Sequence, residues 1–246
     1  MRSDSPQLLT PDLPPTPHRK VNTMSADHLH ATSRSESPAP SLPSPAVDGL
    51  ARPQGRQGTA QPSVTVFCGS RHGLDTRFAQ EAGAFGVWIA TQGWRLVYGG
   101  GNVGLMGELA RAALGAGGEV LGIIPESLMR REVGLEGISR LEVVSDMAIR
   151  KQRLIDEGDL FVILPGGLGT LDEFFEVATL LQLGYHHKPI VLFNQTGFWD
   201  PLLGMLQTLV HEGFVAQREY DAWHVAQDLA ALKTRCVQLL GASAQA

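Results

Sequence analysis

The stretch that decides the fold reads Leu160-Phe161-Val162-Ile163-Leu164-Pro165-Gly166-Gly167-Leu168-Gly169-Thr170. Its first five residues form an unbroken apolar run, which is typical of a parallel strand covered on both faces. A glycine-rich turn follows the run at once, and helical spacing continues over residues 171–183. The stretch therefore predicts a buried strand, a tight turn and a helix.

The same alternation extends in both directions along the chain. Strand-like runs cover residues 64–68, 95–98, 119–124, 141–144, 160–164 and 190–193. Helix-like spacing covers residues 76–91, 105–116, 147–157, 171–183, 199–211 and 226–240. Strands and helices that alternate in this way form parallel sheets with right-handed crossovers. We therefore expect an α/β fold, a Rossmann-like doubly wound parallel sheet with helices on both faces, in a single domain.

The first quarter of the chain has a different composition. Eleven of the 15 prolines fall between Pro6 and Pro62, and residues 1–62 contain no aromatic side chain. A segment so poor in large apolar groups cannot offset the entropy of ordering. We expect a disordered tail over residues 1–62 that carries no chemistry, with Met24 as an alternative start, and a folded domain over residues 63–246.

Charge and cysteine content narrow the function classes. The formal net charge is −5 and the folded part has no basic block, which argues against a nucleic-acid partner. No apolar run is long enough for a membrane span, and prolines interrupt any secretory signal. Cys68 and Cys236 fit no metal or redox spacing, so we expect a reducing, cytoplasmic location. The histidines do not form a metal set either.

Glycine-rich turns follow three of the expected strands, and ligands of such sheets bind at the carboxyl ends of the strands. Glycine lets backbone N–H groups approach an anion, and a helix that starts behind the turn adds unpaired N–H groups. The turn over residues 99–104 lacks the full dinucleotide fingerprint, and no acidic residue ends the next strand, which argues against NAD or FAD. We expect a ligand with a single phosphate cradle. Nucleotide contacts are expected from Gly69, Ser70, Gly100, Gly101, Gly104 and Met106.

Charged residues near these turns have two interpretations each. Asp172 and Glu173 suit the start of a helix, where a negative charge interacts favourably with the helix dipole. A phosphate repels a nearby carboxylate, however, so a carboxylate kept close to the expected phosphate site also suggests a role in acting on another part of the ligand. Arg150 and Lys151 fit a solvated basic face, although one residue of an adjacent pair can point to the sheet edge. Arginine is the better suited of the two to bidentate recognition. Glu132, in an expected loop, carries no signal of its own.

Taken together, these motifs resemble the LOG (Lonely Guy) family, the cytokinin riboside 5′-monophosphate phosphoribohydrolases that were long described as possible lysine decarboxylases. The family hallmark P-G-G-x-G-T-x-x-E stands intact at Pro165–Glu173, with the upstream Arg-Lys pair at Arg150 and Lys151. The segments CGSR, GGGNVGLMG, QLGYHHKPIVLFN and HEGFV are also similar to the family and occur in the same order. The resemblance covers roughly residues 63–215.

The resemblance implies an activity and a set of site residues. The family's catalytic arginine and glutamate fall on Arg150 and Glu173. The implied substrate contacts are Glu132, Arg150, Lys151, Gly167, Leu168, Gly169, Thr170, Leu171, Asp172, Glu173 and Thr179. Leu168 replaces the usual aromatic residue and Asp172 a usual glutamate, which bears on the base that fits: adenine or N6-prenylated adenine. The family needs no metal or organic cofactor and is typically dimeric.

The resemblance therefore implies a hydrolase of purine nucleoside 5′-monophosphates that releases the free base and ribose 5-phosphate. The alternative is a carrier that binds a nucleotide or cofactor on the same fold, as molybdenum-cofactor carriers do; the presence of both Arg150 and Glu173 favours catalysis. A lysine decarboxylase would need a lysine in a pyridoxal-phosphate context. The chain's lysines are Lys20, Lys151, Lys188 and Lys233, and none has that context.

Overall fold

Alternating strands and helices make up the described chain, which in this computed structural model comprises residues 61–132 and 137–243. The strands are β1 (Ser63–Phe67), β2 (Arg95–Tyr98), β3 (Val120–Pro125), β4 (Arg140–Val144), β5 (Leu160–Ile163), β6 (Ile190–Phe193) and β7 (Trp223–Ala226). The helices are α1 (Thr76–Thr91), α2 (Gly104–Gly115), α3 (Glu126–Glu132), α4 (Met147–Glu157), α5 (Leu168–Gln182), η1 (Gln195–Gly197), α6 (Asp200–His211), α7 (Gln217–Tyr220) and α8 (Leu229–Ser243).

All strand pairs in the described sheet are parallel, in the order β4-β3-β2-β1-β5-β6-β7. Strand β1 lies at the centre, where Val66 is in register with Tyr98 of β2 on one side and Val162 of β5 on the other. The strand order reverses direction between β1 and β5. A crevice opens at such a reversal, outside the carboxyl ends of the two strands, and this is where doubly wound folds bind ligands.

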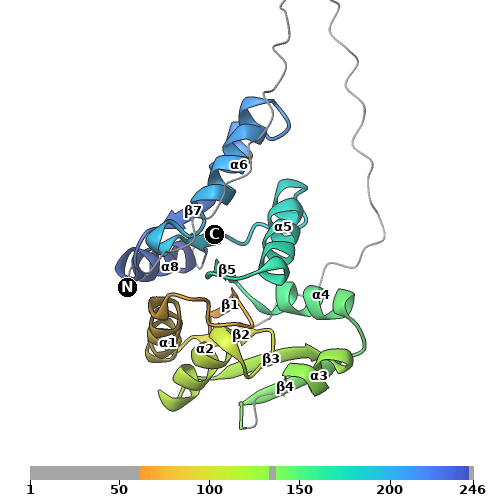
Figure 1. Cartoon of the computed structure of the whole chain (residues 1–246), viewed down its shortest axis with the longest axis vertical. Helices are drawn as coiled ribbons and strands as arrows, with labels where there is room; N and C mark the ends of the chain where they lie inside the picture. The colour runs from red at the N-terminus through yellow and green to blue at the C-terminus, as the bar shows by residue number, and fades with distance from the viewer. Residues whose placement is uncertain (1–60, 133–136, 244–246) are drawn as a thin grey trace, which may run out of the picture. The chain divides into compact units, whose positions relative to one another are not determined.

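Apolar side chains fill a layer on each face of the sheet, so the predicted Rossmann-like fold is confirmed. Alternate residues of β5 point to opposite faces, with Val162 in one cluster and Phe161 in the other. The first cluster packs the sheet against α1, α2 and α8, and the second against α4, α5 and α6. Figure 1 shows α1 and α8 on one side of the sheet and α4 and α5 on the other.

The structure corrects the expected elements at several places. Strand β7 was not expected, because only one residue of this short edge strand, Ala226, is buried. Residues 226–228 were expected to be helical, but Asp228 accepts a hydrogen bond from the N–H of Ala231 and α8 begins at Leu229. Helix α5 begins at Leu168 rather than residue 171: the exposed Gly169 lies in its first turn despite its low helix propensity, and Thr170 is already on the buried face. Helices α3 and α7 were also not expected.

The expected tail over residues 1–62 lies outside the described residues except for its last two. The boundary between tail and domain therefore stays a prediction. Within residues 61–132 and 137–243, no helix combines the length and apolarity that a membrane crossing requires.

Candidate active site

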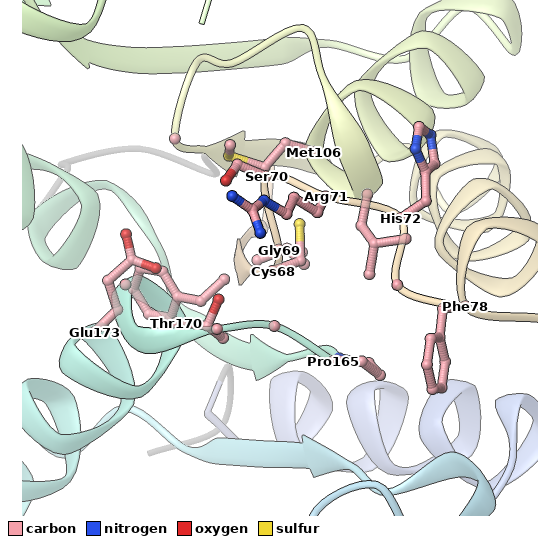
Figure 2. A pocket seen from close by; sticks show the side chains of 18 of the residues that line it. Cys68, Gly69, Ser70, Arg71, His72, Phe78, Met106, Pro165, Thr170 and Glu173 are labelled. Atoms are coloured by element: carbon pink, nitrogen blue, oxygen red, sulfur yellow. The ribbon is translucent and has the colours of Figure 1, made fainter. Parts of the chain in front are cut away.

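A cavity of about 570 Å³ opens at the carboxyl ends of β1 and β5, where the strand order reverses. Figure 2 shows its two sides: the loop after β1 faces the first turns of α5. The lining residues are Val66, Phe67, Cys68, Gly69, Ser70, Arg71, His72, Gly73, Phe78, Gly99, Leu105, Met106, Pro165, Gly166, Gly167, Leu168, Gly169, Thr170, Glu173 and Phe198. A volume of this size accommodates a nucleotide-sized ligand.

The N-terminus of α5 is the feature of this cavity best suited to an anion. Gly167 is the N-cap, and it has no side chain that could satisfy the first N–H groups of the helix. The neighbouring α2 differs, because the N–H groups of Leu105 and Met106 donate to the carbonyl oxygen of Gly69 at 3.0 and 3.4 Å. The helix dipole and unpaired N–H groups of α5 are therefore available to a phosphate.

Arg150 comes from the first turns of α4 and points inward. The carboxylate of Asp146 caps this helix by accepting from the N–H of Ile149, and Arg150 and Leu154 then lie on its buried face. The guanidinium donates from Nε to the Ile123 carbonyl at 3.2 Å and from Nη2 to the Gly99 carbonyl at 3.4 Å. These bonds fix the guanidinium behind the cavity wall.

Glu173 meets this guanidinium from α5. Its Oε1 lies 3.1 Å from Arg150 Nη1, and both side chains are buried. Thr170, Glu173, Phe174 and Val177 share the buried face of α5, as their spacing requires. Burial raises the pKa of Glu173 to about 7, although the positive charge of Arg150 opposes the rise. A carboxyl poised near neutrality in a cavity is a candidate for proton transfer or charge stabilisation.

This position excludes the alternative interpretation of the two acidic residues as helix-start carboxylates. Because α5 begins at Leu168, its first turn holds no acidic residue, and Glu173 lies in the second turn. Asp172 points away from the buried face and its Oδ2 lies 3.2 Å from Lys151 Nζ. Lys151 Nζ also lies 3.0 Å from Glu176 Oε2. Of the adjacent pair, the arginine points inward to Glu173 behind the cavity wall, and the lysine faces carboxylates on α5.

The structure brings some of the expected nucleotide contacts to the cavity and leaves others behind its wall. Gly69, Ser70 and Met106 line it, whereas Gly100, Gly101 and Gly104 do not. Gly104 has a φ of 61°, and a Cβ there would lie 2.3 Å from the Arg71 nitrogen. This glycine therefore lets α2 pack directly against the β1 loop.

The substrate contacts implied by the resemblance divide in the same way. Gly167, Leu168, Gly169, Thr170 and Glu173 line the cavity. The remaining implied contacts with described side chains do not line it: Arg150, Lys151, Leu171, Asp172 and Thr179. Glu132 is the last residue of α3, and its side chain lies outside the described part of the structure. Thr179 is exposed on α5, two turns beyond Glu173.

Sequence reasoning missed three prominent lining residues. Phe78 of α1 and Phe198 close one end of the cavity with an edge-to-face contact at 5.4 Å between ring centroids. Nothing in the local sequence distinguishes them from core aromatics. The third residue, Arg71, does have a sequence signal, because it directly follows Gly69-Ser70 at the end of β1.

Metal-binding and thiol chemistry find little support in the described residues. No group of three His, Cys, Asp or Glu side chains there is placed to hold a metal ion. Cys68 and Cys236 are free and buried. Burial, reinforced by the charge of Glu173, raises the pKa of the Cys68 thiol far above its usual range. A thiol held in that state is a poor nucleophile.

The sequence is similar to a family of phosphoribohydrolases. A family model described as possible lysine decarboxylase matches residues 106–236. The cytokinin riboside 5′-monophosphate phosphoribohydrolase of Rhodococcoides fascians is 44% identical over 189 residues, which cover 76% of this chain and 92% of that protein. The enzyme of that name called LOG in Oryza sativa subsp. japonica is 44% identical over 154 residues, 63% of this chain and 64% of that protein.

Solved structures share the fold. The molybdenum cofactor carrier protein of Chlamydomonas reinhardtii matches with a TM-score of 0.54 at 24% identity, over 74% of this chain and 99% of that one. The molybdenum cofactor binding protein of Rippkaea orientalis matches with a TM-score of 0.57 at 21% identity, over 75% and 98%. At these identities the likeness concerns the fold alone.

Proposed function

The chain belongs to the family of cytokinin riboside 5′-monophosphate phosphoribohydrolases, and from that premise we propose that it hydrolyses the N-glycosidic bond of purine nucleoside 5′-monophosphates. The products are the free base and ribose 5-phosphate. The observation that carries the proposal is a buried carboxyl, Glu173, with a pKa near 7, held by Arg150 at the floor of a cavity with an anion-binding helix end.

Glu173 is the residue that acts on the reacting bond. As the bond between C1′ and the base nitrogen breaks, its electron pair leaves with the base and positive charge builds on the ribose. An ionised carboxylate beside C1′ stabilises that charge, and it orients or deprotonates the water that adds to C1′. A pKa of about 7 lets the same group hold and release a proton at neutral pH.

Arg150 acts through Glu173 in this proposal. Its guanidinium is engaged with the Glu173 carboxylate and with two backbone carbonyls, so it orients that carboxylate and favours its ionised form. Gly167, Leu168, Gly169 and Thr170 hold the 5′-phosphate at the N-terminus of α5. Substrate contacts of Glu132, and of Lys151, Leu171, Asp172 and Thr179, which do not line the cavity, stay a prediction from the family resemblance.

The test of this assignment is the dependence on the 5′-monophosphate. Because one helix end supplies one phosphate cradle, AMP or an N6-alkylated AMP should be cleaved far faster than adenosine or ATP. Release of free base, followed chromatographically over a panel of these four compounds, measures the preference. Equal turnover of adenosine would contradict a phosphate cradle at α5.

The activity should also depend on pH near neutrality. Burial in the folded protein raises the pKa of Glu173 to about 7. The carboxyl is therefore mostly protonated below this pH and mostly ionised above it, and the stability that the fold gains from the protonated form is lost as the pH rises through about 7. The ionised carboxylate is the active form, hence kcat/KM for AMP should rise with pH through about 7. A profile that is flat between roughly pH 5.5 and 8.5 would contradict an ionised Glu173 as the active species.

We further propose a homodimer in the cytoplasm. Apolar side chains are exposed on or beside α5 and α6, among them Phe175, Leu183, Tyr185 and Phe214, and a second copy would cover them. Sedimentation should then give twice the chain mass of 26.5 kDa. The two free cysteines suit a reducing compartment.

A further inference from the structure

A phosphomonoester carries up to two negative charges, and the N-terminus of α5 supplies only about half a positive charge. The other basic side chains near the cavity are engaged elsewhere. Arg150 Nη1 pairs with Glu173, and Lys151 Nζ pairs with Asp172 and Glu176. His72 Nε2 lies 3.2 Å from Glu108 Oε1. A further positive charge would therefore strengthen phosphate binding in this cavity.

Arg71 has the position and the charge for this task. Among the described residues that line the cavity, it carries the one permanent positive charge, and no carboxylate of the described chain lies within ion-pair distance of it. Figure 2 shows its side chain extending from the β1 loop toward the side of the cavity where Thr170 and Glu173 lie. The guanidinium thus lies across the cavity from the N-terminal turn of α5.

The backbone that carries Arg71 is held on both sides. The Gly69 N–H donates to the Pro165 carbonyl at 3.0 Å, which ties the loop to the signature turn. The Gly69 carbonyl accepts from the N-terminus of α2, and Gly104 packs against the Arg71 nitrogen. Binding a phosphate therefore orders the arginine side chain alone, which lowers the entropic cost of recognition.

We propose that Arg71 binds the 5′-phosphate of the substrate, opposite the N–H groups of α5, and so makes the cavity selective for phosphomonoesters over unphosphorylated nucleosides. Guanidinium groups recognise phosphate oxygens with two parallel hydrogen bonds. The proposal rests on the proposed function, namely that a nucleoside monophosphate occupies this cavity.

The test compares the binding of AMP, ribose 5-phosphate and adenosine to the full-length protein by calorimetry. Arg71→Ala should weaken the first two ligands roughly 10- to 100-fold, the size of a charge-assisted contact, and leave adenosine unchanged. Arg71→Lys keeps the charge and should recover part of the loss. Arg218→Ala, which removes an exposed arginine of α7 outside the cavity, is the matched control and should bind all three as wild type does.

The binding measurement does not require turnover, so it separates this proposal from the proposed hydrolysis. Wild-type binding of AMP and ribose 5-phosphate by Arg71→Ala would overturn the role of Arg71. An equal loss of adenosine binding would also overturn it, because the residue would then shape the cavity rather than recognise phosphate. A wild-type protein that binds AMP without cleaving it would overturn the hydrolysis and leave the Arg71 comparison intact.

Discussion

Glu173→Gln should lower kcat for a nucleoside monophosphate by about 10²-fold or more while nucleotide binding stays near the wild-type value. Glutamine keeps the size and hydrogen-bonding capacity of the side chain, so the cavity retains its shape. It removes the negative charge that faces the ribose in the transition state, where positive charge builds. Release of ribose 5-phosphate measures the rate, and calorimetry with AMP measures the binding.

The matched control is Glu176→Gln, the same change one turn further along α5. Glu176 pairs with Lys151 and does not line the cavity, so this variant should keep the wild-type rate. Melting temperatures of both variants establish that they fold. A Glu173→Gln protein that turns over at nearly the wild-type rate would reduce Glu173 to a structural partner of Arg150.

Gly99→Ala should cost a comparable factor, about 10²-fold in kcat, without altering any charged residue. A Cβ at this position would collide with Arg150 Nη2, so the guanidinium must shift, and we expect its contact with Glu173 to loosen. Because Arg150 lowers the pKa of Glu173, its displacement should also shift the rise of activity to a pH above about 7. Rate and pH profile are measured together with AMP as substrate.

Gly83→Ala is the control for this prediction. A Cβ at Gly83 meets only Ala112 Cβ at an ordinary 3.8 Å, inside α1 and away from the cavity. It should therefore leave both rate and pH profile unchanged. If Gly99→Ala retains the wild-type rate and profile, the contact between Arg150 and Glu173 does not position the carboxylate.

The layered fold followed from the sequence because its buried strands are unbroken apolar runs followed by turns. Strand β7 was not predicted from the sequence, because His224 and Val225 of this edge strand stay partly exposed and no continuous apolar run marks the strand. The start of α5 was placed too late because glycine has a low helix propensity, and Gly167 and Gly169 flank the first helical residue. Local propensity therefore located the elements and missed their exact boundaries.

At the site, a motif identified Glu173, but the motif did not give the contacts of Arg150. That Arg150 turns inward to two backbone carbonyls depends on Ile123 and Gly99, which lie 27 and 51 residues away along the chain. Likewise, the glycine-rich turn before α2 predicted N–H groups free to bind a ligand, but the first of these groups donate to the carbonyl oxygen of Gly69. Contacts between distant segments carry no local signal.

The most direct test of the proposed hydrolysis is product analysis with purified wild-type protein. Incubated with AMP and with an N6-alkylated AMP, the protein should release equal amounts of free base and ribose 5-phosphate, one of each for every nucleotide consumed. Calorimetry on the same preparation reports whether the nucleotide binds. Tight binding of the monophosphates with neither product formed would contradict the hydrolase and identify a nucleotide carrier on this fold.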